Sequence, residues 1–276
     1  DADGVLAVGG GSAIDLAKAI SAATGLPVVS VPTTYSGSEW TTFFGIRDPG
    51  RRMKGGGAGA RLAGIVYEPE LFLDLPRDQS GGTALNGLAH SAEALYVAGR
   101  NAEADQHALE GARLIGSSLP RVLEHGDDLE ARTTLLRGAM EAGAALGSAG
   151  LGLGHAMAQA LGGRFGIAHG AANALTLPPA LRFNQLVAAD AEDPGQFARL
   201  DRCHLGRHAT SGGADHRIGE GALQRGGHRV PDAAIELDQD VVLRCNPDRE
   251  LESSGEAELV DRVDVLWVGE RDVERV

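Results

Sequence analysis

The sequence predicts an α/β unit that is followed by an all-helical unit. Near its beginning, a short apolar run, a glycine-rich turn, a helical stretch and a second apolar run follow one another, which is the order of a βαβ unit. From about residue 80, apolar residues instead recur with the 3.6-residue period of helices. A hydrophobic fraction of 43% and a charged fraction of 23% agree with a folded globular chain.

The βαβ unit comprises two strands and one helix. Residues 4–8 have the pattern of a buried strand that runs into the glycine-rich turn, and a helix is expected over 13–24. Gly25 and Pro27 end this helix, and a second strand covers 28–31. Because the two strands flank a helix, they are expected to lie parallel in one sheet with a right-handed crossover.

The rest of the chain divides into a short β section, a helical section and a final segment. Residues 45–60 are rich in Gly and Arg and indicate a loop or hairpin, and 62–67 form a further strand candidate. Helices are expected over 81–99, 102–122, 128–149, 151–162 and 170–183. We therefore predict an α/β domain over 1–78, a helical domain over 79–186 and a divergent segment over 187–276.

The segment 187–276 shows no sustained period of 3.6 or 2 residues. Its scattered Arg, Gly, His and Asp residues are typical of three cases: a disordered polar tail, a divergent helical region, and GC-rich coding DNA translated out of frame. The out-of-frame interpretation is favoured, and we assign no function to this segment.

Charge and composition exclude several classes of function. A net charge of −13 leaves no basic surplus to neutralise the phosphates of a nucleic acid. The chain has no uninterrupted apolar run of about 18 residues, so no membrane span is expected. Its two cysteines, Cys203 and Cys245, lie far apart, which argues against a disulfide scaffold and indicates a cytoplasmic protein.

The turn Gly9-Gly10-Gly11-Ser12 predicts a phosphate-binding site. A strand that runs through glycines into a helix leaves backbone N–H groups at the helix N-terminus, where the helix dipole favours an anion. Ile14 stands where G-x-G-x-x-G has its third glycine, so the turn alone is equally compatible with a plain connection. Thr33 and Thr34 end the next strand at the sheet edge where ligands bind. Together these features predict a partial dinucleotide-binding parallel sheet domain.

Three histidines of the helical section are candidates for one site. His90 follows Asn86 at i, i+4, on the same face of a helix, while His155 and His169 belong to two later helical stretches. Imidazoles from separate helices can surround iron or zinc, with the Asn86 carbonyl oxygen as a further ligand. For each histidine alone, a plain helix-surface position is the alternative. His107 lacks such a setting and is expected to be solvated.

Four segments resemble the iron-containing alcohol dehydrogenases. In chain order they read GGGSAIDLAKAI, LPVVSVPTTYSGSE, NGLAHSAEALY and GLGHAMAQALGGRFGIAHGAANAL, and they span residues 5 to about 184. Within this family the chain is most similar to maleylacetate reductases, because of TTYSGSE, YEPELFLDLP and Asn86 at the head of NxxxH.

The resemblance implies a dinucleotide-binding α/β domain and a helical-bundle domain, with residues 81–170 carrying the active site in the cleft between them. It implies that the cofactor contacts are Gly9, Gly10, Gly11, Ser12, Thr33, Thr34, Ser38 and Lys54. The positions of the family's metal ligands correspond to Asn86, His90, His155 and His169. It also implies further strands ahead of residue 1 and, for a complete enzyme, a homodimer.

Two residues depart from the pattern of the alcohol-oxidising members. Asn86 replaces an acidic metal ligand, which removes one negative charge and is expected to weaken the binding of a divalent metal. Gln159 stands where those members carry another histidine, and an amide cannot relay a proton at neutral pH. Both departures favour reduction of maleylacetate over oxidation of an alcohol.

We therefore expect reduction of maleylacetate to 3-oxoadipate with NADH or NADPH, within the degradation of aromatic compounds. The three histidines are expected to support the developing enolate, as hydrogen-bond donors or through a metal. Lys54, Arg61 or Arg164 is expected to bind a carboxylate of this small dicarboxylate substrate. The alternatives are a metal-dependent alcohol or aldehyde dehydrogenase of the same fold and an inactive fragment of such an enzyme.

Overall fold

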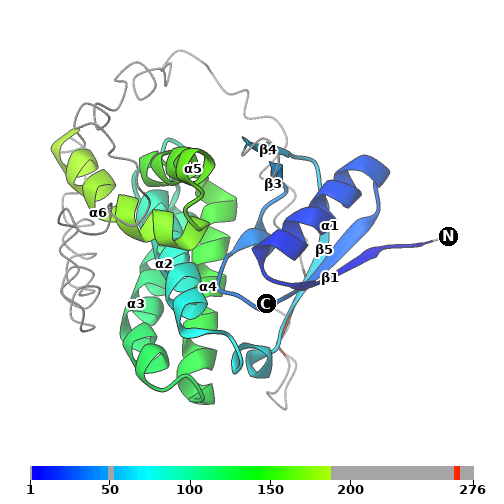
Figure 1. The fold of residues 1–276 in the computed structure, drawn as a ribbon, viewed down its shortest axis with the longest axis horizontal. Helices are drawn as coiled ribbons and strands as arrows, with labels where there is room; N and C mark the ends of the chain where they lie inside the picture. Colours follow the sequence, from blue (N-terminus) through cyan, green and yellow to red (C-terminus); the bar gives the residue numbers. More distant parts are fainter. Residues whose placement is uncertain (1, 49–52, 188–263, 268–276) are drawn as a thin grey trace, which may run out of the picture.

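A parallel sheet and a group of long helices make up the structure, which is a computed structural model that describes residues 2–48, 53–187 and 264–267 (Figure 1). The α/β part and the helical part lie side by side in Figure 1. The predicted fold class, an α/β unit followed by an all-helical unit, is confirmed.

The sheet has the strand order β1-β2-β5-β6, and all of its neighbouring strands are parallel. The first three strands are β1 (Val5–Gly9), β2 (Pro27–Pro32) and β5 (Arg61–Tyr67), and helix α1 (Gly11–Thr24) connects β1 to β2. Ile14 and Ala17 of α1 pack on Ala7 and Val28 of the sheet. Because β1 pairs in register with β2, from Val5 opposite Val28 onward, the ends of both strands reach the same edge.

Strand β6 (Asp264–Trp267) comes from the final segment, for which the sequence predicted no element. It pairs with Gly64–Tyr67 of β5 and so extends the sheet beyond β5. The other residues of the segment 187–276, apart from Val187 at the end of the last helix, lie outside the described residues. The predicted nature of that segment therefore stays a prediction.

A β-hairpin leaves the sheet between β2 and β5, which resolves the predicted loop or hairpin over 45–60. A short 3-10 helix, η1 (Ser38–Trp40), precedes strands β3 (Phe44–Asp48) and β4 (Met53–Gly57), which pair antiparallel. Glycine is required in β4, because a Cβ atom on Gly56 would lie 2.4 Å from the Phe44 carbonyl oxygen. The hairpin contacts the helical part through β4.

The five predicted helices are all present, with shifted ends. A 3-10 helix, η2 (Pro69–Phe72), leads into α2 (Arg77–Ala94), which starts and ends earlier than the predicted 81–99. Pro76 occupies the N-cap position of α2. After α2 ends at Ala94, a non-helical connection leads to Asn101. The Asn101 side chain caps the next helix by accepting a hydrogen bond from Ala104 N. The remaining helices are α3 (Ala102–Glu124), α4 (Leu129–Ala149), α5 (Leu153–Phe165) and α6 (His169–Val187).

Small residues bring the central helices together. A Cβ atom on Gly138 of α4 would lie 2.9 Å from Ile115 of α3, and one on Gly111 would lie 2.8 Å from the Ser91 hydroxyl of α2. Such close approach leaves little room for side-chain motion, because protein interiors are close-packed. Helix α2, which carries Asn86 and His90, is therefore held by a rigid support.

A buried arginine joins the two parts of the molecule. Arg132 of α4 is 2% exposed and donates hydrogen bonds to the Tyr35 and Ser80 hydroxyls, at 3.2 and 3.1 Å, and to the carbonyl oxygens of Leu75 and Gly126. Tyr35 directly follows the Thr33-Thr34 segment, whereas Leu75 lies in the connection to α2. Within the described part of the chain, the hydrogen bonds of the Arg132 side chain go to neutral oxygens. Arg132 therefore fixes the threonine segment relative to the helical part.

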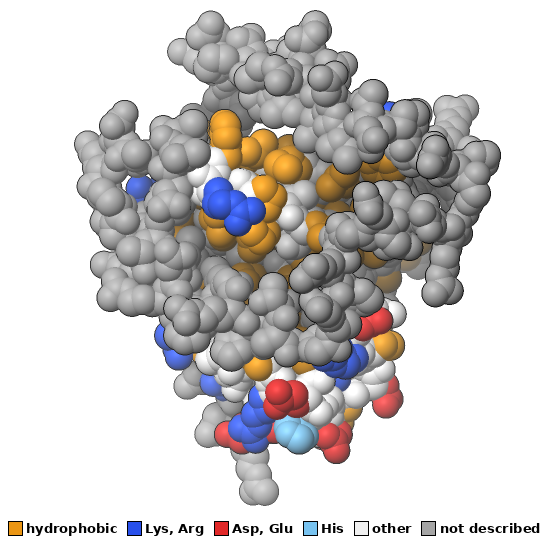
Figure 2. Space-filling model, turned by 60° about the vertical axis from the view of Figure 1, so that its left-hand side comes forward, with side chains coloured by type: hydrophobic (Ala, Val, Ile, Leu, Met, Phe, Trp, Pro, Cys, Tyr) orange, Lys and Arg blue, Asp and Glu red, His pale blue; other side chains and the backbone are white. Residues whose placement is uncertain are grey.

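Figure 2 shows one face of the molecule, part of which is covered by residues drawn in grey. Where described side chains are visible, hydrophobic ones gather near the middle of the view, and charged side chains of both signs lie below them. Exposed apolar side chains of α5 and α6 include Phe165, Leu175 and Phe183. Among the residues that the structure describes, no helix has the length and apolar character needed to cross a membrane.

Candidate active site

The glycine-rich turn lies against the end of β2 and forms a narrow cradle. Gly9 has a φ of 145°, and its carbonyl oxygen accepts a hydrogen bond from Thr33 N at 3.0 Å. A Cβ atom on Gly10 would lie 2.9 Å from the Thr34 methyl group, and one on Gly11 would lie 3.1 Å from the Ser36 hydroxyl. The buried Thr34 hydroxyl has no hydrogen-bond partner in the structure. The cradle therefore fits the diphosphate of a dinucleotide, which accepts hydrogen bonds from hydroxyl and backbone N–H groups.

Helix α1 anchors the segment that carries Ser38. The Ser38 hydroxyl donates a hydrogen bond to Asp15, and Lys18 Nζ donates to the carbonyl oxygens of Ser38 and Phe43, at 2.8 and 2.6 Å. Burial lowers the pKa of Lys18, while its ion pair with Asp15 opposes this shift. Ser38 lies next to Gly11, where the sequence placed it, and its hydroxyl takes part in holding this segment.

The three basic residues expected near the substrate lie in different places. Lys54 belongs to β4, opposite Arg47 in the hairpin that contacts α5, and its side chain lies outside the described residues. Arg61 begins β5 and donates a hydrogen bond to the Gly25 carbonyl oxygen, at the sheet edge away from the glycine turn. The expectation that Arg61 binds substrate is therefore wrong. Arg164 is exposed and lies over the Phe165 ring.

His90 of α2, His155 of α5 and His169 at the start of α6 come together as predicted. The ring centroids of His90 and His155 are 4.7 Å apart, and those of His155 and His169 are 5.7 Å apart. His90 and His155 are buried, whereas His169 is exposed. The cluster therefore meets solvent through His169.

The amide of Asn86 contacts two of the imidazoles directly, those of His90 and His155. Its Nδ2 donates a hydrogen bond to the Ser36 carbonyl oxygen at 3.0 Å and lies 3.3 Å from His90 Nε2. Its Oδ1 lies 3.3 Å from His155 Nε2 and accepts a 2.6 Å hydrogen bond from Asn173 Nδ2. Because Ser36 and Asn173 fix which amide atom is the donor, the orientation of the Asn86 side chain is determined. Asn86 thereby also ties the cluster to the segment that follows Thr34.

Asn173 is a site residue that the sequence analysis missed. Its Nδ2 lies 3.1 Å from His169 Nε2, so it carries the network from Asn86 to the third histidine. Its own Oδ1 is buried and has no hydrogen-bond partner among the described residues. The i, i+4 spacing that singled out Asn86 and His90 recurs between His169 and Asn173. That spacing was the signal that could have found it.

Burial and neighbouring charged groups shift the pKa values of His90 and Glu93. Burial, together with the charges of His155 and His169, holds the pKa of His90 well below its usual value. His90 is therefore neutral and can accept the amide hydrogen of Asn86 at Nε2. Burial raises the pKa of Glu93, but its hydrogen bond to His155 and the charge of that ring outweigh burial, and the pKa is lowered.

The donor set does not fit a tightly bound divalent metal. A metal must face the imidazole lone pairs, but the amide N–H groups of Asn86 and Asn173 point at Nε2 of His90 and His169. The Asn86 oxygen already accepts a hydrogen bond, and the buried carboxylate of Glu93 faces backbone N–H groups. Within the described ranges, no three His, Cys, Asp or Glu side chains are arranged to hold a metal ion.

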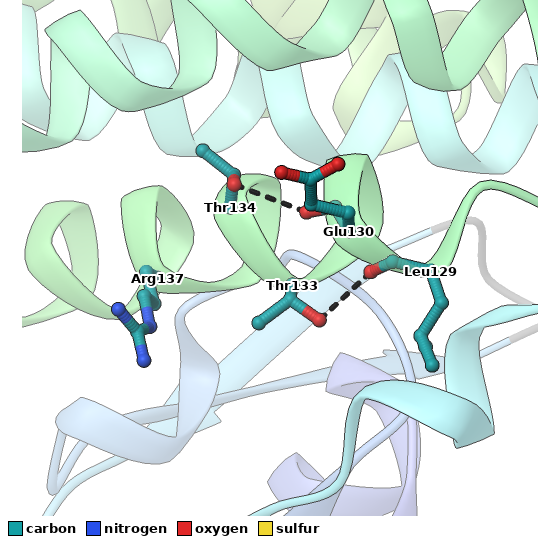
Figure 3. Close-up of a pocket in the computed structure, with 5 residues that line it drawn as sticks. All are labelled: Leu129, Glu130, Thr133, Thr134 and Arg137. Atoms are coloured by element: carbon teal, nitrogen blue, oxygen red, sulfur yellow. Dashed lines mark hydrogen bonds between the residues drawn. The ribbon is translucent and has the colours of Figure 1, made fainter. Parts of the chain in front are cut away.

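A shallow surface hollow on α4 is separate from these residues (Figure 3). It is lined by Leu129, Glu130, Thr133, Thr134 and Arg137, and it contains none of the candidate site residues. The two threonine hydroxyls donate to carbonyl oxygens of their own helix, one turn earlier. Because this hollow contains none of the residues that the sequence indicated, the candidate active site remains the histidine cluster with the adjacent cradle.

Comparison with protein families finds two matching models. Residues 1–63 match the model described as iron-containing alcohol dehydrogenase, and residues 82–215 match the model of the C-terminal part of the Fe-containing alcohol dehydrogenase family. The two matches cover the cradle and all three histidines of the cluster.

Individual relatives agree with these matches. The chain is 40% identical to a maleylacetate reductase of Burkholderia cepacia over 69% of this chain and 54% of that protein. It is 34% identical to maleylacetate reductase 1 of Rhodococcus opacus over 98% of this chain and 74% of that protein. The crystal structure of maleylacetate reductase from Rhizobium sp. superposes with a TM-score of 0.66 and 36% identity, over 73% of this chain and 56% of that one.

The chain spans about half the length of most of these relatives. The alignment with the Rhodococcus protein covers nearly all of this chain, so it continues into the segment 187–276. In order, spacing and fold, the matched segments are those of one family. This chain belongs to the iron-containing alcohol dehydrogenase family.

Proposed function

We propose that this chain catalyses, or forms part of an enzyme that catalyses, the reduction of maleylacetate to 3-oxoadipate with NADH or NADPH. The observation that carries the proposal is the network in which the Asn86 amide contacts His90 and His155 and is linked to His169 through Asn173. Such a cluster offers hydrogen-bond donors to an anion. The similarity to several maleylacetate reductases supports the same substrate.

The reaction requires a hydride, a proton and a site that stabilises negative charge. A bound nicotinamide supplies the hydride, which adds to the alkene carbon that lies β to the ketone of maleylacetate. The electron pair of the double bond moves toward the ketone oxygen as an enolate, and a proton then joins the α carbon to give 3-oxoadipate. The chain's own residues must therefore bind the diphosphate, support the enolate oxygen and deliver a proton.

Each histidine suits a different part of this task. His155 directs Nδ1 at the Glu93 carboxylate, at 2.7 Å, and Nε2 at the Asn86 oxygen, at 3.3 Å, so the geometry accommodates a proton on each ring nitrogen. His155 is thus the group suited to supply a proton. His169, which is exposed, is suited to contact the substrate directly. Neutral His90 accepts a hydrogen bond from Asn86 and helps to fix the amide.

The cofactor is proposed to lie with its diphosphate at the cradle formed by the glycine turn. The unpartnered Thr34 hydroxyl and the backbone of Gly10 and Gly11 are the groups proposed to contact it. Lys54 is proposed to reach the cofactor or a substrate carboxylate, because β4 contacts α5, the helix that carries His155. No step of the proposed reaction passes through a metal, because the amide hydrogens already occupy the imidazole lone pairs.

The experiment is a comparison of substrates with the full chain. Consumption of NADH or NADPH is followed with maleylacetate, and reduction of NAD⁺ or NADP⁺ is followed with a series of primary alcohols. The proposal predicts turnover of maleylacetate with kcat/KM at least about 100-fold above that for any alcohol. Faster alcohol oxidation would instead support a metal-dependent alcohol dehydrogenase. Tight cofactor binding without turnover of maleylacetate would contradict the substrate assignment.

A further inference from the structure

A buried carboxylate that no sequence motif indicated lies directly behind the histidine cluster. Glu93 of α2 is fully buried, and each of its oxygens accepts from two donors. Oε2 accepts from Gly152 N and lies 2.7 Å from His155 Nδ1, while Oε1 accepts from His155 N at 2.9 Å and from the Tyr96 hydroxyl at 3.4 Å. One side chain therefore holds both the backbone and the ring of His155.

The start of α5 is shaped around this carboxylate. Gly152 and His155 supply two of the N–H groups that lack partners at a helix N-terminus, and Glu93 satisfies both from another helix. A Cβ atom on Gly154 would lie 2.7 Å from Glu93 Oε1, and one on Gly152 would lie 3.2 Å from its Cδ. Glycine at these positions gives the carboxylate the space to reach the ring behind them.

The contact at Nδ1 determines which ring nitrogen of His155 faces the rest of the cluster. An ionised carboxylate only accepts hydrogen bonds, so Nδ1 carries a hydrogen and Nε2 is the atom that faces Asn86 and the rest of the cluster. Without Glu93, the ring could rotate, and once the Nε2 proton has been transferred the remaining hydrogen could move from Nδ1 to Nε2. Carboxylates that hold an imidazole in this way set both its orientation and its tautomer.

We propose that Glu93 is a positioning residue that fixes the ring of His155 for protonation of the enolate. This inference rests on the proposed function for its kinetic consequence, but its structural content, an Nδ1–H held by Glu93, can be measured without turnover. It assigns a role to a residue that contacts neither the substrate nor the cofactor.

The first test replaces the carboxylate by its amide in Glu93→Gln. An amide has one acceptor oxygen, so two of the four donors must then face an NH₂ group, and the ring is no longer fixed. We expect kcat for maleylacetate to fall about 10- to 100-fold. KM for maleylacetate and Kd for NADH are expected to change less than about threefold. The matched control, Tyr96→Phe, removes the longest of the four hydrogen bonds to Glu93 and should leave kcat within about threefold.

A second pair of variants covers the case in which Glu93→Gln fails to fold. Gly154→Ala places a methyl group against Glu93 Oε1, whereas Gly163→Ala, in the same helix, meets nothing within 4 Å. Both changes should favour the helix itself by about 1 kcal/mol. We expect Gly154→Ala to lower kcat at least about fivefold with an unchanged melting temperature or a higher one, and Gly163→Ala to leave kcat unchanged.

The deciding readout is the ¹⁵N NMR spectrum of the histidine rings, with the His155 signals identified by their loss in His155→Gln. The proposal predicts a protonated Nδ1 with a strongly downfield proton in the unaltered chain, and loss of that proton signal in Glu93→Gln or Gly154→Ala. An unprotonated Nδ1 in the unaltered chain would overturn it, as would full kcat in Glu93→Gln. A chain that shows this signal but turns over no maleylacetate would refute the proposed function alone.

Discussion

The glycine cradle and the histidine cluster are two sites built in opposite ways. The cradle consists mainly of backbone from two short segments, residues 9–12 and 33–38, which one βαβ unit brings together. The cluster consists of side chains from α2, α5 and α6, held by amides of Asn86 and Asn173 that are 87 residues apart. A site made of backbone therefore depends on local conformation, whereas a site made of side chains depends on how distant helices pack.

Arg132 connects these two regions, so its loss should affect both and have the largest effect. Arg132→Met leaves up to four buried oxygen acceptors without their donor, on both sides of the boundary between the two parts. We expect the free energy of unfolding to fall by about 3 kcal/mol, measured by urea denaturation. Arg121→Met, at a side chain that is 56% exposed, is the control and should cost about 1 kcal/mol or less. Equal effects of the two changes would show that Arg132 does not join the two regions.

Asn86→Ala should disable the cluster alone. It removes the amide that contacts Ser36, Asn173 and two imidazoles. We expect kcat for maleylacetate to fall at least about 100-fold, while Kd for NADH, measured by fluorescence titration, stays within about twofold. Among the described residues, the Asn184 amide donates a hydrogen bond to Ala180 O of its own helix, and Asn184→Ala should leave both quantities unchanged. A parallel loss of NADH binding in Asn86→Ala would mean that the two sites are not separate.

Gly10→Val should disable the cradle alone. Its Cβ would lie 2.9 Å from the Thr34 methyl group, so the turn must open or Thr34 must move. We expect Kd for NADH to rise about 10- to 100-fold, with a smaller change in kcat at saturating NADH. Gly81→Ala, whose new methyl group would make only an ordinary contact with Leu123, serves as the control. Unchanged NADH binding in Gly10→Val would remove the cradle from the cofactor site.

The smallest effect is expected at the pair formed by His107 and Glu141, which lies outside both the cradle and the histidine cluster. His107 was expected to be solvated, but its Nδ1 lies 2.6 Å from Glu141, and the hydrogen bond raises the pKa of His107 despite partial burial. Because the pKa of His107 is raised in the folded state, the pair stabilises the fold fully at pH values below the unfolded-state pKa of about 6.5. This stabilisation disappears as the pH rises through the folded-state pKa of His107. For a pair whose side chains are 35% and 21% exposed, we expect about 0.5 kcal/mol.

Glu141→Gln measures this contribution. The difference in free energy of unfolding between the unaltered chain and the variant should be largest below pH 6 and should shrink as the pH rises to about 9. A difference that grows with pH would show that His107 is not protonated in the pair. Kd for NADH and kcat should not respond, because neither the cradle nor the cluster contains these residues.

The same contrast explains what the sequence could predict. The βαβ order, the glycine turn and the positions of the helices follow from local patterns, and the structure agrees with them apart from the helix ends. The convergence of His90, His155 and His169 could be proposed because their motifs resemble a known family. The role of Arg61 was misjudged, because the sequence does not show that the start of β5 lies at the far edge of the sheet.

Contacts between distant helices account for the site residues that the sequence did not reveal. Asn173 and Glu93 act through atoms that come together only after α2, α5 and α6 have packed, and Gly154 matters only because Glu93 fills the space beside it. The i, i+4 spacing could place Asn173 beside His169, but no pattern in the sequence indicates its contact with Asn86 or the contact between Glu93 and His155. Strand β6 was missed for a similar reason, since four residues show no period until they pair with β5.

We infer that the Asn86 and Asn173 amides organise the three imidazoles in place of a divalent metal. Turnover of maleylacetate by the full chain, measured in excess chelator and again after addition of Fe²⁺ or Zn²⁺, tests this claim most directly. The account predicts the same kcat, within about twofold, under all three conditions. Loss of activity in chelator that either metal restores would contradict it.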